Sequence, residues 1–490
     1  MAGQQSTRLS LTTKIGFGMG DIYGGGSMLI VGSLYLIFLT DVVRLNPALA
    51  GVVLLLSKGW DAVSDPLMGV LSDRTRTRYG RRRPYFLLGV VLIFLSFVLL
   101  WTPVHFRAEA ARFAFVLFAY LFFSTIITMV MIPYNALAAE LTLDYRERSS
   151  LVSIRMAFSM GSTLVCAVVP LAVVNALPTK SSGYALMGAI FGLFFALPYI
   201  ATFLTTRERP EFQMDQPRIT LRTFIEPFKV RAFRNVLFMY LFSFLAIDIV
   251  EAIIIYFMTY YIGRGGETNL MLGTLLILQL LSIPAFTWLT KRRSKRAAFI
   301  TGASIWLLLA LISFLIVPGL TVYLYYLFAG LVGIGMGGVI VSIYSIFPDI
   351  PDVDELVTGV RREGIYSGMT TFFRKLSSAL ALFLLSQAIA LSGYLPPVEQ
   401  AVNGLTKSVP QTQPAAFILV LRLLFALLPA ILVGICLISA LRYPLSPALH
   451  EELKTLLTRR REAAGGLGDE GSDEDRAEAA RLRRILVEGI

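Results

Sequence analysis

Charged side chains are scarce in this sequence. Asp, Glu, Lys and Arg make up 16% of its 490 residues, while apolar residues make up 56%. Soluble domains carry about 25% charged residues. The composition therefore argues against an ordinary soluble domain and predicts an all-α protein with many helices in a lipid bilayer.

Cysteine and histidine are almost missing. The two cysteines, Cys166 and Cys436, lie within apolar segments, so no disulfide framework or metal site is expected. His105 and His450 lie at or beyond segment ends, which argues against a histidine-centred active site. The sequence also lacks a GxxxxGK[ST] nucleotide loop and any nucleophile–base constellation. We therefore expect neither an enzyme nor a cofactor.

The net charge of +12 could suggest nucleic-acid binding, but its placement argues against it. Six basic residues crowd loop 73–83 and five crowd loop 291–296. Loops dense in Lys and Arg face the cytoplasm. The alternate loops together hold only Arg44, Arg107, Arg112, Lys180, Arg264 and Lys407. We therefore expect a cell inner (plasma) membrane protein with both termini in the cytoplasm and no nucleic-acid partner.

Twelve segments are long and apolar enough to cross a bilayer, which takes about 20 residues. They are 15–40, 47–72, 84–104, 113–140, 149–177, 184–206, 235–262, 268–290, 297–317, 320–347, 364–393 and 415–442. The polar gap 207–234 divides them six and six, which predicts two six-helix bundles, 1–206 and 235–443, joined by a cytoplasmic loop. Residues 444–490 form a charged cytoplasmic tail with a predicted joint at 465–468.

Two aspartates lie within the second predicted span. Asp61 and Asp65 are one helical turn apart and share a face. Carboxylates inside a membrane are costly and need a partner. That partner could be a cation, a solute, or a lysine such as Lys58 or Lys375. A cation or a solute would make the chain a transporter, whereas a lysine would only hold helices together.

Several motifs resemble one transporter family. The first is the loop Gly69…Asp73-Arg74…Gly80-Arg81-Arg82, and the second is the adjoining stretch 60–69 of the second span. Three further motifs lie elsewhere: residues 132–134 with 146–148 and Arg155; residues 352–354 with 358–364; and residues 373–375. From about Lys14 to the twelfth span, the chain resembles the glycoside–pentoside–hexuronide:cation symporters of the major facilitator superfamily, a family that includes the melibiose permease. The resemblance implies twelve spans in two bundles and coupling to a cation.

The resemblance also implies a cation site. The positions that match Asp61, Ser64, Asp65 and Thr128 hold the coupling ion in the family. Sodium favours such hard oxygen ligands. The family pattern often has an amide where Ser64 stands, so sodium, lithium and proton all stay open.

A second set of residues is expected to bind the solute. Asp21 could accept hydroxyl hydrogens from a sugar or could bond a neighbouring helix, and Asp248 with Glu251 could bind the solute or pair with Arg264. Tyr256, Tyr260 and Tyr261 fit an interfacial aromatic belt. The predicted solute-binding residues are Asp21, Tyr23, Lys58, Asn135, Arg155, Asp248, Glu251 and Lys375.

The sequence departs from the family's galactoside site. Gly25 and Met131 stand where the melibiose permease has sugar-binding aspartates, and Asn135 stands where it has tryptophan. A galactoside is therefore disfavoured. Arg155 or Lys375 would suit a carboxylate or a sulfonate.

Charged residues in the predicted cytoplasmic loops form a candidate gate. They could latch the two halves together through a network of ion pairs, or could be solvated loop residues that serve topology alone. These residues are Asp73, Arg74, Glu147, Arg148, Asp354, Arg361, Arg362 and Glu363.

The residues and the family resemblance together imply a cation-coupled symporter that works by alternating access as a monomer. The expected solute is a sugar or sugar acid. The alternative solute is a lysophospholipid or other amphiphile moved with sodium. A sensor or scaffold that transports nothing is a third possibility.

Overall fold

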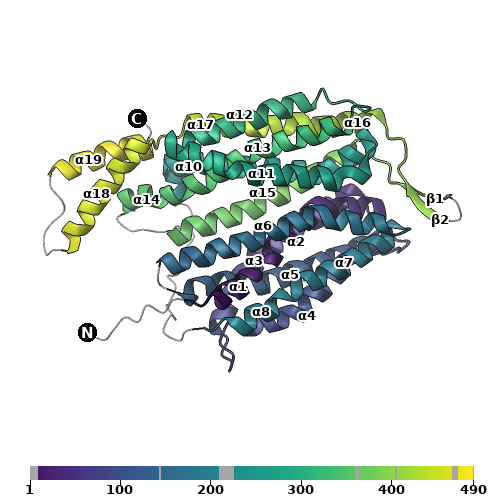
Figure 1. Cartoon of the computed structure of the whole chain (residues 1–490), viewed down its shortest axis with the longest axis horizontal. Helices are drawn as coiled ribbons and strands as arrows, with labels where there is room; N and C mark the ends of the chain where they lie inside the picture. Colours follow the sequence, from purple (N-terminus) through teal and green to yellow (C-terminus); the bar gives the residue numbers. More distant parts are fainter. Residues whose placement is uncertain are drawn as a thin grey trace. The chain divides into compact units, whose positions relative to one another are not determined.

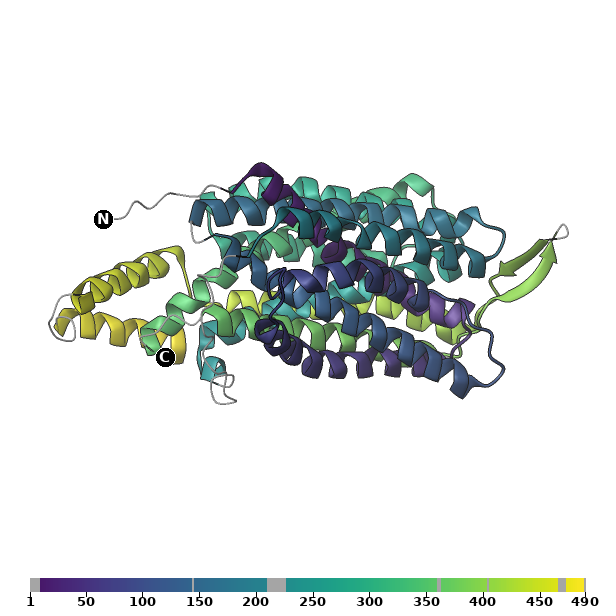
Figure 2. The same cartoon turned by 90° about the horizontal axis from the view of Figure 1, so that it is seen from below.

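The structure is a computed structural model of the whole chain, and it describes residues 9–142, 145–208, 226–358, 363–402, 405–465 and 473–488. Long helices dominate both views of it (Figure 1, Figure 2). The all-α prediction is confirmed, with one short exception described below.

The first half of the chain holds the first six predicted spans. Its elements are α1 (Leu11–Met19), α2 (Asp21–Ile37), the π-helical turn η1 (Phe38–Val42), α3 (Pro47–Arg74), α4 (Arg83–Leu100), α5 (Glu109–Leu141), α6 (Tyr145–Ala176), α7 (Lys180–Ala196) and α8 (Pro198–Thr205). The first span is thus α1, α2 and η1 together, and the sixth is α7 with α8.

The second half holds the other six spans and the tail. Its elements are η3 (Glu226–Lys229), α10 (Arg231–Tyr256), the π-helical turn η4 (Phe257–Ile262), η5 (Gly265–Glu267), α11 (Thr268–Arg292), α12 (Lys295–Ser313), α13 (Val322–Ile346), η6 (Phe347–Asp349), α14 (Ile350–Thr358), α15 (Glu363–Leu391), α16 (Ala415–Arg422), η7 (Leu423–Leu427), α17 (Leu428–Leu441), α18 (Pro447–Gly465), α19 (Asp473–Arg483) and η8 (Arg484–Glu488).

The second predicted span differs from the rest. In the part of the chain that the structure describes, eleven helices are long and apolar enough to cross a membrane, and α3 is not among them. This helix is long enough, with 28 residues, but Lys58, Asp61 and Asp65 lie in it. The helix that lacks apolar character is therefore the one that carries the predicted cation site.

The chain forms two compact units. The first comprises Met1–Asp215, Glu251–Gly273 and Ala379–Leu421, and the second comprises Gln216–Val250, Thr274–Ser378 and Arg422–Ile490. The first unit thus contains the whole first half of the chain together with the adjoining ends of the seventh, eighth, eleventh and twelfth spans. This division cuts through α10, α11 and α15.

An aromatic cluster fills part of the first unit. Trp101 and Tyr184 stack with their ring centroids 5.7 Å apart, and Phe38 and Tyr35 lie against Trp101 at 5.3 and 5.4 Å. All four side chains are buried. Such rings contribute large buried apolar areas, so they fix the first span against α4 and α7.

Glycines allow close helix packing in the second unit. A Cβ added at Gly302 of α12 would lie 2.9 Å from the carbonyl oxygen of Gly335 in α13. Small residues allow two backbones to approach in this way, which is the usual means of close packing between membrane helices.

The exception to the helical pattern is a hairpin. Strands β1 (Val398–Val402) and β2 (Leu405–Val409) pair antiparallel, with Val398 opposite Val409. The hairpin lies between the eleventh and twelfth spans and extends beyond the helix ends (Figure 2).

The tail folds as a helical pair. Helices α18 and α19 contact each other and α14 (Figure 1). Leu453 and Leu456 are fully buried there, and Arg459 forms ion pairs with Asp475 at 2.8 Å and Glu478 at 3.0 Å. Residues 466–468 of the predicted joint lie outside the described residues.

Candidate cation and solute sites

Helix α3 begins at a sharply defined point. The Asn46 side-chain oxygen accepts a hydrogen bond from the Ala48 amide at 2.9 Å, and Pro47 occupies the first helical position. Both features favour a helix start. Pro66 lies inside the helix, directly after Asp65, and lacks the N–H that would bond the carbonyl one turn back. The regular hydrogen bonding of α3 is therefore interrupted beside the second aspartate.

Asp61 is buried between α3 and α5. The residue is only 2% exposed. One carboxylate oxygen accepts a short hydrogen bond from the Ser124 hydroxyl, and the other accepts one from the Lys58 ammonium at 3.1 Å. Lys58 is therefore a partner of Asp61, as one of the sequence-based alternatives anticipated, and Ser124 is a partner that the sequence reading missed.

Asp65 makes a parallel contact one turn further along. Its Oδ1 accepts a hydrogen bond from the Thr128 hydroxyl at 2.7 Å. Since Thr128 follows Ser124 by four residues, one face of α5 presents two hydroxyls to the two carboxylates of α3. The predicted set of Asp61, Asp65 and Thr128 is brought together.

Two more hydroxyls lie on this part of α3. The Ser57 and Ser64 oxygens are buried and have no hydrogen-bond partner within the described residues. A buried hydroxyl without a partner is unfavourable, because it has lost its bonds to water. Ser57 precedes Asp61 by four residues and Ser64 follows it by three, so both lie on the helix face of Asp61 and can supply neutral oxygens to an ion held there.

This arrangement can bind a small monovalent cation. It combines two carboxylates with the hydroxyls of Ser64, Ser124 and Thr128. All of these are hard oxygen donors. Lys58 already supplies one positive charge, so a bound cation would compete with its ammonium for Asp61.

A separate ion pair lies in the first six spans. The Arg155 guanidinium of α6 donates to Asp21 of α2 at 3.1 Å and lies over the Tyr134 ring at 5.0 Å. Asp21 is buried, and the Nε atom of Arg155 is buried with no partner among the described residues. Two of the predicted solute-binding residues thus form one charged cluster with an aromatic face.

Tyr23 and Asn135 lie in different surroundings. Tyr23 is fully buried against Phe195 and Tyr199, with ring centroids 5.7 and 6.2 Å away. Asn135 is exposed on α5. Neither residue contacts the Asp21–Arg155 pair through a described hydrogen bond.

A second buried pair lies in the other unit. Arg374 of α15 donates two hydrogen bonds to Asp248 of α10, at 2.5 and 2.7 Å, and its guanidinium lies 4.7 Å from the Phe244 ring centroid. Arg264, considered above as a partner for Asp248, pairs with Glu267 at 3.0 Å. Arg374 was quoted only as part of a motif, so the sequence reading missed its contact.

Two further predicted solute residues lie on the same helices. Glu251 is half-buried on α10, and Lys375 is half-buried on α15, next to Arg374. Their roles in solute binding stay predictions.

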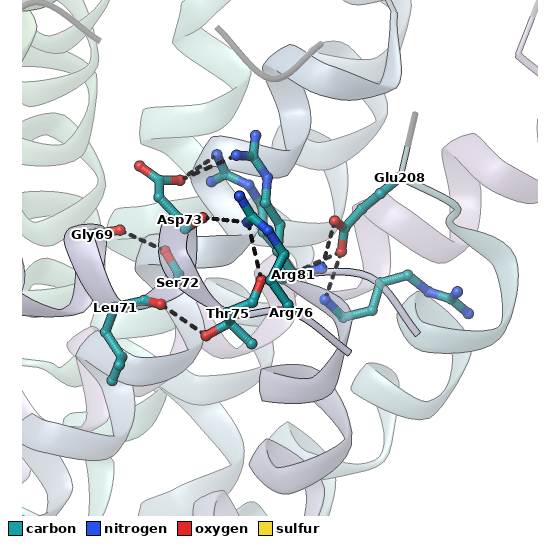
Figure 3. Close-up of polar contacts among 10 residues, drawn as sticks. Gly69, Leu71, Ser72, Asp73, Thr75, Arg76, Arg81 and Glu208 are labelled. Carbon is teal, nitrogen blue, oxygen red and sulfur yellow. Dashed lines mark hydrogen bonds and ion pairs between the residues drawn. The ribbon is translucent and has the colours of Figure 1, made fainter. Parts of the chain in front are cut away.

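The loop between α3 and α4 is held by carboxylates at both ends (Figure 3). Asp73 pairs with Arg82 at 3.1 Å and with Arg81 at 3.9 Å. Glu208, after α8, accepts hydrogen bonds from the backbone amides of Arg81, Arg82 and Arg83 at 2.8, 2.7 and 3.0 Å. A carboxylate is favoured there, because free N–H groups and the helix dipole meet at a helix N-terminus.

Gly80 makes room for this contact. Its φ is +106°, and a Cβ at this position would lie 2.5 Å from the Glu208 Oε1. The glycine of the motif is thus required by backbone conformation and by space. Glu208 lies in the polar segment after the sixth span, where no motif draws attention to it.

The predicted gate residues are distributed over several contacts. Glu147 pairs with Lys14 at 2.9 Å, Arg74 is exposed at the end of α3, and Asp354 is buried in α14. Arg361 and Arg362 lie outside the described residues, as do the side chains of Arg148 and Glu363. The latch between the two halves stays a prediction.

The Tyr256–Tyr261 aromatic belt needs a correction. Tyr256 is fully buried and its hydroxyl is 2.7 Å from that of Thr40. Tyr260 donates a hydrogen bond to Asp41 at 2.7 Å. These two tyrosines join helix ends inside the first unit, because polar partners on the first span attract their hydroxyls.

The eleven long apolar helices of the described residues, together with the two aspartates of α3 that bond hydroxyls of α5, define a polytopic membrane transporter. Comparison with known proteins agrees: residues 16–447 match the family described as MFS/sugar transport protein. The chain belongs to this family.

Its relatives are symporters by name. An uncharacterized symporter of Synechocystis, sll1374, is 28% identical over 93% of this chain and 98% of its own length. YagG of Escherichia coli, which is named as a putative glycoside/cation symporter, is 26% identical over 94% of this chain and 97% of its own length. Sodium-dependent lysophosphatidylcholine symporter 1-A of Danio rerio is 25% identical over 94% of this chain and 91% of its own length.

Solved structures show the same fold. A bacterial homologue of the human lysosomal transporter Spinster matches with a TM-score of 0.63 at 12% identity, covering 91% of this chain and all of its own. The nucleoside transporter NupG matches with a TM-score of 0.59 at 13% identity, covering 88% of this chain and 97% of its own. The predicted family and fold are thereby confirmed.

Proposed function

We propose that this chain is a cation-coupled symporter that moves a sugar or sugar acid across the inner membrane by alternating access. The observation that carries the proposal is the pairing of Asp61 and Asp65 with hydroxyls of α5 inside a membrane helix. Sodium is the first candidate ion, and proton and lithium are the others.

Charge balance gives the coupling its physical basis. Two carboxylates near each other in a low dielectric repel, and a cation between them removes that repulsion. Ion binding would then draw α3 and α5 together through Asp61, Asp65, Ser124 and Thr128. If the resulting arrangement favours solute binding, the solute favours ion binding by the same factor.

The solute assignment rests on two ion pairs. Asp21–Arg155 and Asp248–Arg374 are each joined by charged hydrogen bonds and each guanidinium faces an aromatic ring. Carboxylates accept hydrogen bonds from sugar hydroxyls, and guanidinium groups bind carboxylates in a fork geometry. The match to the MFS/sugar transport family supports the same class of solute.

A lysophospholipid is the second candidate. The similarity to sodium-dependent lysophosphatidylcholine symporters of Danio rerio and Gallus gallus spans 94% and 95% of this chain. An amphiphile would use the same ion site but would need an apolar surface for its acyl chain.

Uptake into proteoliposomes tests the proposal. Purified protein is given an inward sodium gradient and a panel of labelled pentosides, hexosides, hexuronides and lysophosphatidylcholine. We expect gradient-dependent accumulation of a sugar or sugar acid, and its loss in Asp61→Asn. The matched control is Glu267→Gln, which neutralises a carboxylate paired with Arg264 away from α3.

The outcomes separate the hypotheses. Accumulation of lysophosphatidylcholine alone would replace the sugar assignment with the amphiphile. Sodium-dependent uptake that persists in Asp61→Asn would refute the ion site. Binding of a solute without accumulation under any gradient would identify a sensor in place of a transporter.

A further inference from the structure

Another buried carboxylate lies at the end of the first span. Asp41, in η1, is 5% exposed. Its Oδ1 accepts a hydrogen bond from the Thr40 hydroxyl at 2.8 Å and a short one from the Tyr394 hydroxyl, and its Oδ2 accepts one from Tyr260 at 2.7 Å. Three neutral donors therefore surround this carboxylate.

The hydroxyl oxygens also lie close to one another, although Tyr260 and Tyr394 each donate their single hydrogen to Asp41. Tyr260 and Tyr394 have their hydroxyl oxygens 2.8 Å apart, and those of Thr40 and Tyr256 are 2.7 Å apart. The Tyr394 ring lies 5.5 Å from that of Tyr260 and 5.9 Å from that of Tyr256. We call Thr40, Asp41, Tyr256, Tyr260 and Tyr394 the Asp41 network.

The network joins distant parts of the sequence within the first unit. Thr40 and Asp41 end the first span, Tyr256 and Tyr260 end the seventh, and Tyr394 follows the eleventh. Asp41 and Tyr394 are 353 residues apart. Both η1 and η4 are π-helical, a local irregularity that is frequent at functional positions. The contact therefore ties the first half of the chain to the second half.

A second contact joins α3 and α15 in the same unit. The Gln387 side chain donates a hydrogen bond to the Ala48 carbonyl at 3.0 Å. One turn along α3, a Cβ added to Gly51 would collide with the Ser386 hydroxyl. The start of α3 and the end of α15 are therefore in direct contact, and only a glycine at position 51 allows it.

We propose that the Asp41 network, with the Gly51–Ser386 contact, is an outer gate: it seals the outer end of the spans and comes apart when the solute enters. The loops at this end are those poor in basic residues, which the charge distribution assigns to the outside. The inference rests on the proposed function, because only a protein with alternating access needs such a gate.

The chemistry suits a gate that opens readily. Burial, and then the adjacent Asp41 carboxylate, raise the pKa of Tyr394 above that of a free phenol, so its hydroxyl stays a neutral donor. A carboxylate held by hydroxyls alone exchanges them for water when it is exposed, with a small net change in free energy. Among the described residues, Asp41 has no salt-bridge partner, and hydroxyl groups hold its carboxylate.

Hydrogen exchange on the full-length protein in lipid nanodiscs tests the gate. We compare the wild type with Asp41→Asn, Tyr260→Phe and Gly51→Ala. Amide exchange should rise on the order of tenfold in 38–45, 257–264 and 389–396, which is the change expected when one hydrogen bond to an ionised group is lost. Exchange in 83–100 should stay unchanged.

Tyr35→Phe is the matched control. It removes a buried phenol hydroxyl from the same unit, and that hydroxyl has no hydrogen-bond partner among the described residues. We expect no change in the three gate segments. Unchanged exchange in all three gate variants would overturn the inference, as would an equal rise in 83–100, which would mean general destabilisation.

The gate and the transport proposal fail in different ways. If Asp61→Asn abolishes sodium-driven uptake while the gate variants exchange like wild type, the gate is wrong and the symporter stands. If no gradient drives uptake of any solute, the proposal of symport is refuted. The gate inference is then refuted as well, even if amide exchange rises in the Asp41 network, because a protein that transports nothing needs no gate.

Discussion

Removal of the Ser124 hydroxyl gives the sharpest test of the cation site. Ser124 is buried on α5 and donates directly to Asp61. A serine hydroxyl can donate its hydrogen to the carboxylate while its lone pairs face a cation. Ser124→Ala therefore removes both an oxygen ligand and a donor that fixes the Asp61 side chain.

The expected magnitude follows from the contact. A hydrogen bond to a charged group contributes about 1.5–3 kcal/mol. If roughly half of this is recovered by Lys58 and by water, about 1 kcal/mol of ion-binding free energy is lost, which is a five- to tenfold weaker affinity for sodium. The weakening should appear in the ion affinity, with solute affinity at saturating sodium close to wild type.

Calorimetric titration of sodium into purified protein measures the change. Ser33→Ala is the control, because Ser33 is an equally buried serine whose hydroxyl bonds only the Leu29 carbonyl of its own helix. Sodium affinity should be unchanged in that control. Wild-type sodium affinity in Ser124→Ala, in a folded protein, would refute the ligand role of this residue.

Three further outcomes are expected. Gly80→Ala should lower the stability of detergent-solubilised protein by about 1–3 kcal/mol, because a residue with a Cβ disfavours the positive φ at this position and its Cβ would collide with Glu208; wild-type melting would contradict this. Arg374→Ala should destabilise by about 3–5 kcal/mol in denaturant unfolding by leaving Asp248 buried and unpaired, and the double replacement of both residues should recover part of the loss. His450→Ala should speed tryptic cleavage in α18 by removing its contact with an aspartate of α14 at 3.1 Å, and an unchanged cleavage rate would mean that the leucines alone dock the tail.

Local patterns predicted the helices well, and they predicted the meeting of three residues of the proposed ion site. The apolar run 235–262 ends where η4 ends, at Ile262, because the length of a membrane span is set by bilayer thickness. Asp61, Asp65 and Thr128 meet because their spacing fixes the helix faces. The same periodicity, applied to α5, would have found Ser124 four residues before Thr128.

Long-range pairs could not be predicted in the same way. Asp248 meets Arg374 across 126 residues, and Asp41 meets Tyr394 across 353. Such contacts depend on which helices pack together and at what height, which neither hydropathy nor helical periodicity contains. Tyr256 was misjudged for this reason: an aromatic at a span end fits lipid or protein equally well until its neighbour is known.

Glu208 bears on how the protein is made. Its carboxylate accepts hydrogen bonds from three backbone amides at the start of α4 and so holds the segment after α8 there. All residues of this contact have therefore been synthesised once residue 208 has been added to the chain. The first six spans can therefore lock this end during synthesis, before α10 has emerged from the ribosome. Translation arrested beyond residue 208 should yield a protease-resistant nascent chain, and Glu208→Ala should make that chain labile.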